Sequence, residues 1–381
     1  MFGTAGGFGT GSGLFGTSAN SSLTTATAAK DYELPAPPDD TVQALRFSPP
    51  SIQQNYLAAG SWDGLVRVWE VNIPPLTVNQ FGAAPTSINV QALPKAQQSA
   101  GGPVLDLCYS DDGSKIFFGS TDKTVKMWDL ASNQVTQIGA HDNAVKSVHF
   151  VQAPTYQCVM TGSWDKTLKF WDARQPNPVG TLQLPDRLYA ADVYYPMAVA
   201  CTAGKQCVVY QLDNQPREWK KLEINLKNML RCVSICVDKK TNQPTGFAVG
   251  SVEGRVAIQY LNPSNPKDNF TFKCHRVEQA SNVQEIYPVN DLAFHPVHGT
   301  LATVGGDCRY SYWDKDSRVK LKGSEKCAQS ITRCCFSARG EVFGYAVGYD
   351  WGQGHEYSNP NKKPQVFLNY DYENMKPRKK T

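Results

Sequence analysis

One short pattern occurs three times in the first half of this chain, starting at Gly60, Gly119 and Gly162. Each copy begins with small residues, passes through Asp followed by Gly or Lys, and continues as apolar residues alternating with polar ones. The Asp-Gly or Asp-Lys dipeptide indicates a tight turn. The alternation of apolar and polar residues has the period of a half-buried strand. Each copy closes on Trp and an acidic residue, as at Trp171-Asp172. The pattern therefore predicts repeated units of strand, turn and strand.

A self-similar unit that ends in Trp-Asp resembles the blade of a WD40 propeller. Weaker copies of the last strand of the pattern follow at residues 207–210, 256–259 and 310–314. A further blade begins at residues 331–336. The sequence thus predicts an all-β fold, a seven-bladed WD40 β-propeller over residues 31–372. A closed ring leaves fewer open strand edges, so residues 31–34 are expected to form the outer strand of the seventh blade.

Both ends of the chain lie outside the predicted ring. Residues 1–30 are rich in Gly, Ser, Thr and Ala and cannot bury enough apolar area to offset chain entropy, which predicts a disordered tail. Phe-Gly pairs at Phe2, Phe8 and Phe15 resemble the repeats of nuclear-pore proteins, although an ordinary low-complexity tail explains them equally well. Residues 373–381 form a basic tail that is either a nuclear import signal or a solvated terminus.

Four residues of the third copy, His141, Thr161, Asp165 and Trp171, occupy positions that resemble the WD40 hydrogen-bonding tetrad. An imidazole can link a turn carboxylate to a strand hydroxyl, which in turn meets the indole N–H, so that buried polar groups are satisfied. His141 and Asp165 alone would suggest an acid–base pair, but within the repeat they are predicted to be structural. The sequence contains no nucleophile-elbow, zincin or Walker motif, so we predict no enzyme activity, no metal site and no cofactor.

Composition narrows the remaining function classes only slightly. The 38 basic and 34 acidic residues give a net charge of +4, which is too mild to imply nucleic acid by itself. No apolar run approaches the roughly 18 residues of a membrane span. The 11 cysteines are scattered through predicted strands without zinc-ligand spacing, so we expect them to be reduced residues of the core.

Residues that the blade pattern does not explain are the best candidates for a functional site. Arg255 directly follows the turn Glu253-Gly254, and Arg276 ends the run 272–276. Two arginines near one blade could form bidentate hydrogen bonds with the carboxylates of an acidic peptide. Spacing alone favours the competing interpretation, that both are solvated surface cations.

Several runs together resemble the messenger-RNA export factors of the nuclear pore, a WD40 family related to the spindle-checkpoint propeller. These runs are residues 163–172, 250–257, 270–276, 293–299, 349–351 and 354–355. The resemblance covers roughly residues 31–380. It implies that the propeller binds an acidic hairpin segment of an FG nucleoporin, that Arg255 and Arg276 meet the acidic residues of this segment, and that the complex engages single-stranded RNA. It also implies a role in messenger-RNA export and a location in the nucleus, at the pore and nuclear envelope, with shuttling to the cytoplasm.

Residues for RNA contact are less clearly marked. Lys220, Lys221, Lys227 and Arg231 lie near Trp219 in the sequence, which places cations beside a ring that can stack a base, but no nucleic-acid motif is present. The Phe-Gly tail offers a contact for transport receptors. The alternative function is a spindle-checkpoint scaffold that binds checkpoint kinases through a similar segment. That scaffold would share the fold and the arginines but has no evident use for the Phe-Gly tail.

Overall fold

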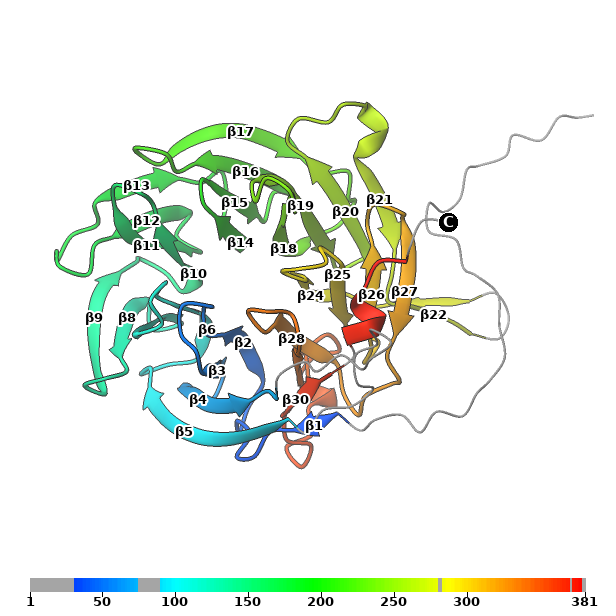
Figure 1. Ribbon diagram of the computed structural model, residues 1–381, viewed down its shortest axis with the longest axis horizontal. Helices are drawn as coiled ribbons and strands as arrows, with labels where there is room; N and C mark the ends of the chain where they lie inside the picture. Colours follow the sequence, from blue (N-terminus) through cyan, green and yellow to red (C-terminus); the bar gives the residue numbers. More distant parts are fainter. Residues whose placement is uncertain (1–30, 75–89, 280–282, 371, 379–381) are drawn as a thin grey trace, which may run out of the picture.

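The computed structural model describes residues 31–74, 90–279, 283–370 and 372–378. These residues form a ring of seven four-stranded antiparallel sheets and one separate two-stranded sheet (Figure 1). The predicted all-β, seven-bladed propeller is therefore confirmed. The predicted tail at 1–30, with its Phe-Gly pairs, lies outside the described residues, as do residues 379–381. No helix in the described part of the chain is long and apolar enough to cross a membrane.

The strands follow one another blade by blade, from the centre of the ring outwards. The first blade comprises β2 (Val42–Phe47), β3 (Asn55–Ser61), β4 (Leu65–Asn72) and β5 (Gln91–Ser99). The second comprises β6 (Val104–Tyr109), β7 (Lys115–Ser120), β8 (Thr124–Asp129) and β9 (Gln134–Ala140), and the third β10 (Val145–Gln152), β11 (Gln157–Ser163), β12 (Thr167–Trp171) and β13 (Gly180–Gln183). The fourth comprises β14 (Leu188–Tyr194), β15 (Met197–Thr202), β16 (Gln206–Gln211) and β17 (Arg217–Glu223).

The later blades keep this order in spite of their weaker sequence pattern. The fifth comprises β18 (Leu230–Val237), β19 (Pro244–Ser251), β20 (Arg255–Tyr260) and β21 (Phe270–Lys273), and the sixth β24 (Val289–Phe294), β25 (Leu301–Gly305), β26 (Tyr310–Asp314) and β27 (Val319–Gly323). Between them, β22 (Arg276–Glu278) and β23 (Gln284–Ile286) form the separate hairpin. Short 3-10 helices occur at η1 (Pro266–Asp268), η2 (His355–Tyr357) and η3 (Tyr372–Met375).

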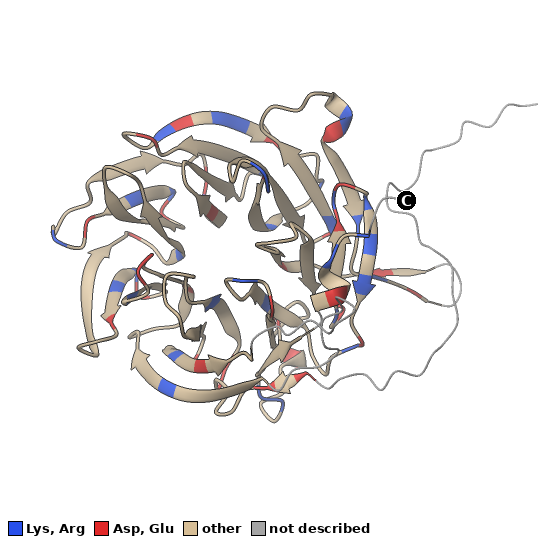
Figure 2. Ribbon diagram, viewed as in Figure 1, with Lys and Arg blue, Asp and Glu red and all other residues tan. Residues whose placement is uncertain are grey.

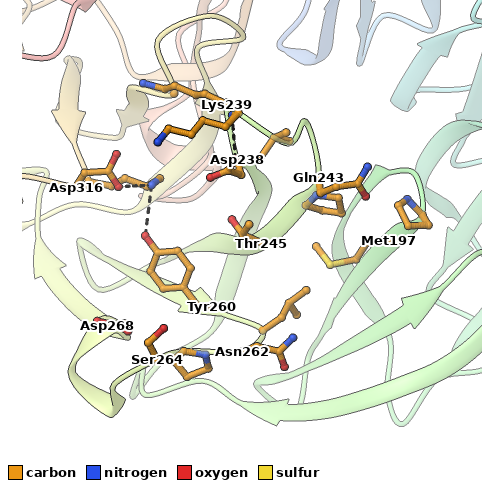
Figure 3. A pocket seen from close by; sticks show the side chains of 18 of the residues that line it. Met197, Asp238, Lys239, Gln243, Thr245, Tyr260, Asn262, Ser264, Asp268 and Asp316 are labelled. Atoms are coloured by element: carbon orange, nitrogen blue, oxygen red, sulfur yellow. Dashed lines mark hydrogen bonds and ion pairs between the residues drawn. The ribbon is translucent and has the colours of Figure 1, made fainter.

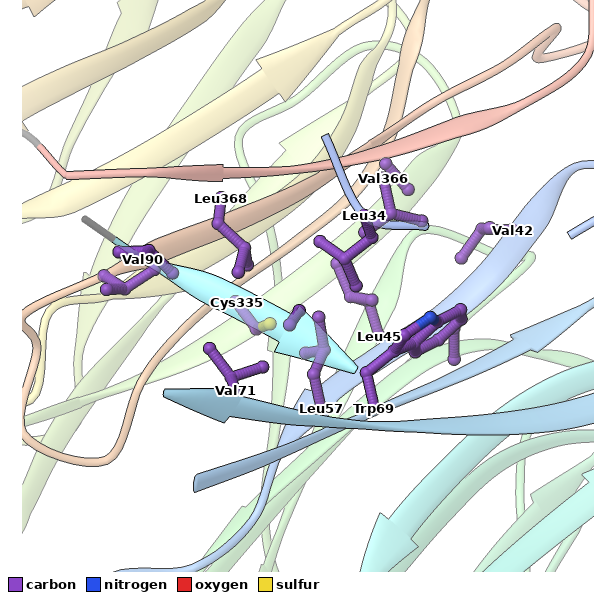
Figure 4. Packing of buried hydrophobic residues seen from close by; sticks show 14 residues of the cluster. Leu34, Val42, Leu45, Leu57, Trp69, Val71, Val90, Cys335, Val366 and Leu368 are labelled. Atoms are coloured by element: carbon purple, nitrogen blue, oxygen red, sulfur yellow. The ribbon is translucent and has the colours of Figure 1, made fainter. Parts of the chain in front are cut away.

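The seventh blade joins the two ends of the chain. It contains β28 (Ile331–Phe336), β29 (Phe343–Val347), β30 (Gln365–Asn369) and, as its outer strand, β1 (Tyr32–Glu33). Tyr32 pairs with Leu368 in this sheet, which confirms the expected closure by the N-terminal strand. Leu34 and Leu368 are both buried in a cluster that also contains Trp69 of the first blade (Figure 4). Apolar packing between the first and last blades therefore accompanies the shared sheet.

The repeated glycine and turn residues have clear structural reasons. A Cβ at Gly119 would lie 2.4 Å from a methyl group of Val145, the first residue of the next inner strand, so the blades could not approach as closely with a larger residue. In the turn that follows, Lys123 has a φ of 73° and the Asp122 carboxylate accepts the backbone N–H of Thr124 at 2.9 Å. The repeat therefore encodes both the turn and the spacing between blades.

Candidate functional site

The predicted tetrad of the third blade is hydrogen bonded throughout. His141 Nδ1 lies 2.8 Å from the carboxylate of Asp165, and His141 Nε2 lies 2.8 Å from the hydroxyl of Thr161. That hydroxyl also accepts the indole N–H of Trp171 at 2.7 Å. Burial lowers the pKa of His141, so the imidazole is neutral at neutral pH. One of its ring nitrogens therefore donates a hydrogen bond and the other accepts one. The imidazole is closed off from solvent, which leaves it no access to a substrate.

A second tetrad, which the sequence analysis missed, holds the sixth blade together. His275 lies 2.7 Å from Asp307 and 2.9 Å from the hydroxyl of Thr303, which accepts the indole N–H of Trp313 at 3.0 Å. The Thr-to-Trp separation is 10 residues in both tetrads, and this was the signal that could have revealed the second one. The histidine stands 28 residues before the threonine here but 20 in the third blade. The additional residues form the β22–β23 hairpin.

This tetrad positions Arg276, because the arginine directly follows His275. The Arg276 guanidinium donates to the backbone carbonyls of Glu253 at 2.9 Å and Gly254 at 3.3 Å, and to the side-chain oxygen of Gln284 at 2.9 Å. Gly254 has a φ of 60°, and a Cβ there would lie 2.7 Å from the Cys274 carbonyl oxygen. Only glycine is compatible with this turn, which keeps its carbonyl against Arg276.

The structure brings Arg255 and Arg276 together. Burial and the charge of Arg255 lower the pKa of Arg276, so the two positive charges repel each other. Lys273 adds a third positive charge, since it pairs directly opposite Arg255 in the fifth blade. We call these three residues the arginine surface. Within the described residues the Arg255 side chain forms no hydrogen bond or ion pair, and the guanidinium of Arg276 is bound by neutral oxygens.

Exposed apolar side chains lie beside the arginine surface. Arg276 pairs with Ile286 in the β22–β23 hairpin, which projects from the rim of the ring (Figure 1). Ile286 is 49% exposed and Val283, just before β23, is 58% exposed. The hairpin also carries exposed acids at Glu278 and Glu285. The surface therefore combines unneutralised cations, apolar contacts and a short sheet to which further strands can be added.

A second candidate surface is a groove of about 800 Å³ on the fourth, fifth and sixth blades. Its lining, shown in part in Figure 3, includes several basic and aromatic residues that come from distant parts of the sequence, namely Trp219, Lys239, Lys240, Phe270, Lys315 and Arg318. The Arg318 guanidinium lies 4.3 Å from the centre of the Phe270 ring. Lys315 is bound to Asp316 and lies 3.4 Å from the Tyr260 hydroxyl.

The two candidate surfaces lie at opposite ends of the blades. The groove contains residues of the β18–β19 and β20–β21 connections, whereas Gly254 lies in the β19–β20 turn. In an antiparallel sheet, successive connections alternate between the two ends. One face of the ring therefore carries the arginine surface and the other carries the groove, so two ligands can bind without competing for space.

Comparison with known proteins identifies the family. A WD domain, G-beta repeat model matches residues 31–70, 94–129 and 132–172. Protein Rae1 of Drosophila melanogaster is 59% identical over 348 residues, which cover 91% of this chain and 96% of the relative. The mRNA export factor of Xenopus tropicalis is 55% identical over 384 aligned positions, covering 100% of this chain and 99% of the relative. The chain belongs to the mRNA export factor family.

Solved structures of more distant proteins support the fold of this mRNA export factor family member. The crystal structure of the WD40 beta propeller domain of Doa1 aligns with a TM-score of 0.62 at 18% identity, over 88% of this chain and 95% of that one. The structure of U3-55K aligns with a TM-score of 0.66 at 16% identity, over 90% and 98% of the two chains. At this level of identity the likeness concerns the propeller alone.

The structure separates the four residues that the sequence grouped for RNA contact. Lys220 and Lys221 lie on β17, the outer strand of the fourth blade, whereas Arg231 lies on β18, the innermost strand of the fifth. Lys220 Nζ lies 4.8 Å from the centre of the Trp219 ring, at the border of the groove, and Lys221 pairs with Glu218 at 3.3 Å. The structure therefore does not bring these four candidate residues together at one site. Residues that adjoin in sequence lie at opposite edges of neighbouring blades.

Lys227 lies apart from the other three. It belongs to the connection between β17 and β18, where its backbone N–H donates to the carboxylate of Glu253 at 3.1 Å and its carbonyl accepts from Lys205 at 3.2 Å. Asn228 binds the same Glu253 carboxylate at 3.0 Å. Lys227 thus supports the turn beside the arginine surface, on the face opposite the groove.

Proposed function

We propose that this chain is a non-enzymatic adaptor in mRNA export that holds an acidic hairpin segment of an FG nucleoporin on its arginine surface. The observation that carries the proposal is the juxtaposition of Arg255 and Arg276, neither of whose guanidinium groups is bound by a carboxylate from the described residues. The relatives named mRNA export factor, at 54–56% identity over the whole chain, support the pathway. They also support a place of action in the nucleus, at the pore.

The geometry suits an acidic ligand for three reasons. Arg276 is already held by carbonyl oxygens, so little side-chain entropy is lost when its charge meets a carboxylate. Arg255 and Lys273 are directly opposite on paired strands, where like charges repel until a partner neutralises them. Ile286 offers an apolar contact next to the charges. A peptide with alternating acidic and apolar residues would satisfy all of these groups.

The hairpin suggests how such a segment would be held. Among the described residues, β23 pairs with β22 alone, so its second edge presents free main-chain groups. A peptide that adds to a sheet edge gains main-chain hydrogen bonds, and its alternate side chains enter neighbouring pockets. An acidic hairpin could therefore extend this sheet while its carboxylates reach the arginine surface.

We further propose that the groove takes part in binding single-stranded RNA. Its lysines and Arg318 can contact phosphates, and Trp219, which is 42% exposed and lies beside Lys220, can stack a base. The acids Asp238, Asp268 and Asp316 also line the groove, which favours a few defined phosphate contacts over a uniformly basic track. Because the groove and the arginine surface are on opposite faces, RNA and nucleoporin can be bound together.

An affinity pull-down from nuclear extract tests the nucleoporin proposal. The full chain should recover an FG nucleoporin, and Arg255→Glu/Arg276→Glu should not. A charge-matched control, Arg174→Glu/Arg217→Glu, changes two exposed arginines on the third and fourth blades and should recover the nucleoporin normally. Equal recovery by all three proteins would sink the proposal. Recovery of a checkpoint kinase without a nucleoporin would favour the spindle-checkpoint alternative.

A further inference from the structure

The innermost strands line a small open cavity with an excess of positive charge at the centre of the ring. The cavity has a volume of about 50 Å³ and is lined by four basic residues, each from a different blade. They are Arg46 of β2, Lys146 of β10, Arg231 of β18 and Arg333 of β28. Figure 2 shows basic positions on several of the inner strands around the central opening. Only two acidic residues, Asp106 and Asp291, line the same cavity.

Both acids are already engaged in joining blades. The Asp106 carboxylate accepts the backbone N–H of Val148 in the next blade at 3.0 Å, and the Asp291 carboxylate accepts that of Cys334 at 3.0 Å. Asp106 also lies 3.9 Å from the Arg46 guanidinium. These contacts recur from blade to blade, since they satisfy strand N–H groups at the blade interfaces. The acids therefore have a structural role and leave part of the positive charge unneutralised.

In the described part of the chain, two of the four basic side chains have no partner of their own. Arg333 donates to the carbonyls of Gln43 and Asn290, the second at 3.1 Å. The side chains of Lys146 and Arg231, by contrast, form no hydrogen bond or ion pair within the described residues. Burial, reinforced by Arg333 and Arg231, lowers the pKa of Lys146 to about 7, and burial and Arg333 also lower the pKa of Arg231. Both residues are half-buried, and like charges brought together where water is partly excluded destabilise the fold unless an opposite charge joins them.

The size of the cavity indicates what that opposite charge is. One water requires roughly 10–15 Å³ by the same measure, so the cavity has room for about three to five water-sized groups. A tetrahedral oxyanion has this size. The guanidinium fork and the ammonium group are the donors that proteins use for phosphate oxygens.

We propose that this central cavity binds a small oxyanion of the phosphate class, held by Lys146, Arg231 and Arg333. These residues come from the third, fifth and seventh blades, so one anion would connect three blades that are not adjacent in the ring. Binding would neutralise the repulsion between these charges and stabilise the closed propeller. It would also explain why Arg231, an RNA candidate by sequence, faces the channel.

Thermal unfolding at constant ionic strength tests the site. With inorganic phosphate replacing chloride, the melting temperature of the full chain should rise, because the anion binds the folded state only. Lys146→Met/Arg231→Met should lose this rise and should melt higher than wild type in chloride alone, since the repulsion is gone. The matched control, Lys221→Met/Arg217→Met, removes two exposed charges of β17 and should keep the phosphate response.

A direct binding measurement keeps the test independent of how the variants fold. Equilibrium dialysis of wild-type protein against radiolabelled inorganic phosphate should give one bound anion per chain, and a phosphoserine peptide should compete for it if the natural source is a phosphorylated segment. Failure of the peptide to compete would assign the site to free phosphate. Absence of bound phosphate, or an unchanged phosphate response in the double variant, would overturn the proposal.

Discussion

Replacing Thr161 with valine tests whether the buried tetrad stabilises the ring. The substitution keeps the shape of the side chain but removes the hydroxyl that meets both His141 Nε2 and the Trp171 indole N–H. Each buried polar group left unpaired costs about 1–3 kcal/mol, so the variant should lose about 2–6 kcal/mol of unfolding free energy. With an unfolding entropy of roughly 2.1 cal/mol/K per residue, a ring of this size that unfolds as one unit should melt about 3–8 °C lower.

Differential scanning calorimetry of three variants separates this effect from simple loss of packing. Thr161→Ser keeps the hydroxyl and removes one methyl group, which should cost only about 1 kcal/mol. Thr303→Val removes the equivalent hydroxyl of the sixth blade and should lower the melting temperature as much as Thr161→Val. If Thr161→Val melts within a degree of Thr161→Ser, the tetrad does not stabilise the ring as we reason.

Three further predictions concern the surfaces and the channel. Gly254→Ala forces a left-handed turn on a residue with a Cβ, and we expect a loss of about 1–3 kcal/mol in calorimetry together with weaker nucleoporin binding. Lys239→Glu/Arg318→Glu should weaken single-stranded RNA binding and flatten its salt dependence, measured by fluorescence anisotropy, whereas Lys123→Glu on an exposed turn should change neither. The pKa of Lys146 is about 7 in the folded state and about 10.4 in the unfolded state. Between these two pH values the unfolded state binds more protons, so the stability of the wild type rises with pH. Lys146→Met should therefore stabilise the protein most below pH 7 and progressively less toward pH 9; a constant difference would contradict the assignment.

The sequence predicted the parts of the fold that repeat at constant spacing. The turn at Asp122-Lys123 and the tetrad around Thr161 follow from one pattern, and neither depends on distant parts of the chain. The tetrad around Thr303 escaped notice because the β22–β23 hairpin separates its histidine from the rest of the motif. An insertion between two strands leaves the blade intact but changes the spacing on which recognition depends.

The candidate surfaces were harder to predict because ring closure determines them. Lys239 and Arg318 line one groove although they lie on different blades, and nothing in their local sequence connects them. Lys220 and Arg231 are close in sequence, yet one lies on an outer strand and the other borders the central channel. A propeller places the end of one blade at its rim and the start of the next at its centre, so closeness in sequence is a poor guide to closeness on the surface.

The most direct test of the central claim is the affinity of an acidic FG-nucleoporin hairpin segment for wild type and for Arg255→Glu/Arg276→Glu, measured by isothermal titration calorimetry. Charge-assisted hydrogen bonds contribute about 1.5–3 kcal/mol each, so losing two should weaken the Kd at least about 100-fold. A segment with its acidic residues changed to lysine should bind the double variant better than it binds wild type. Equal affinity of the acidic segment for both proteins would show that Arg255 and Arg276 do not hold it.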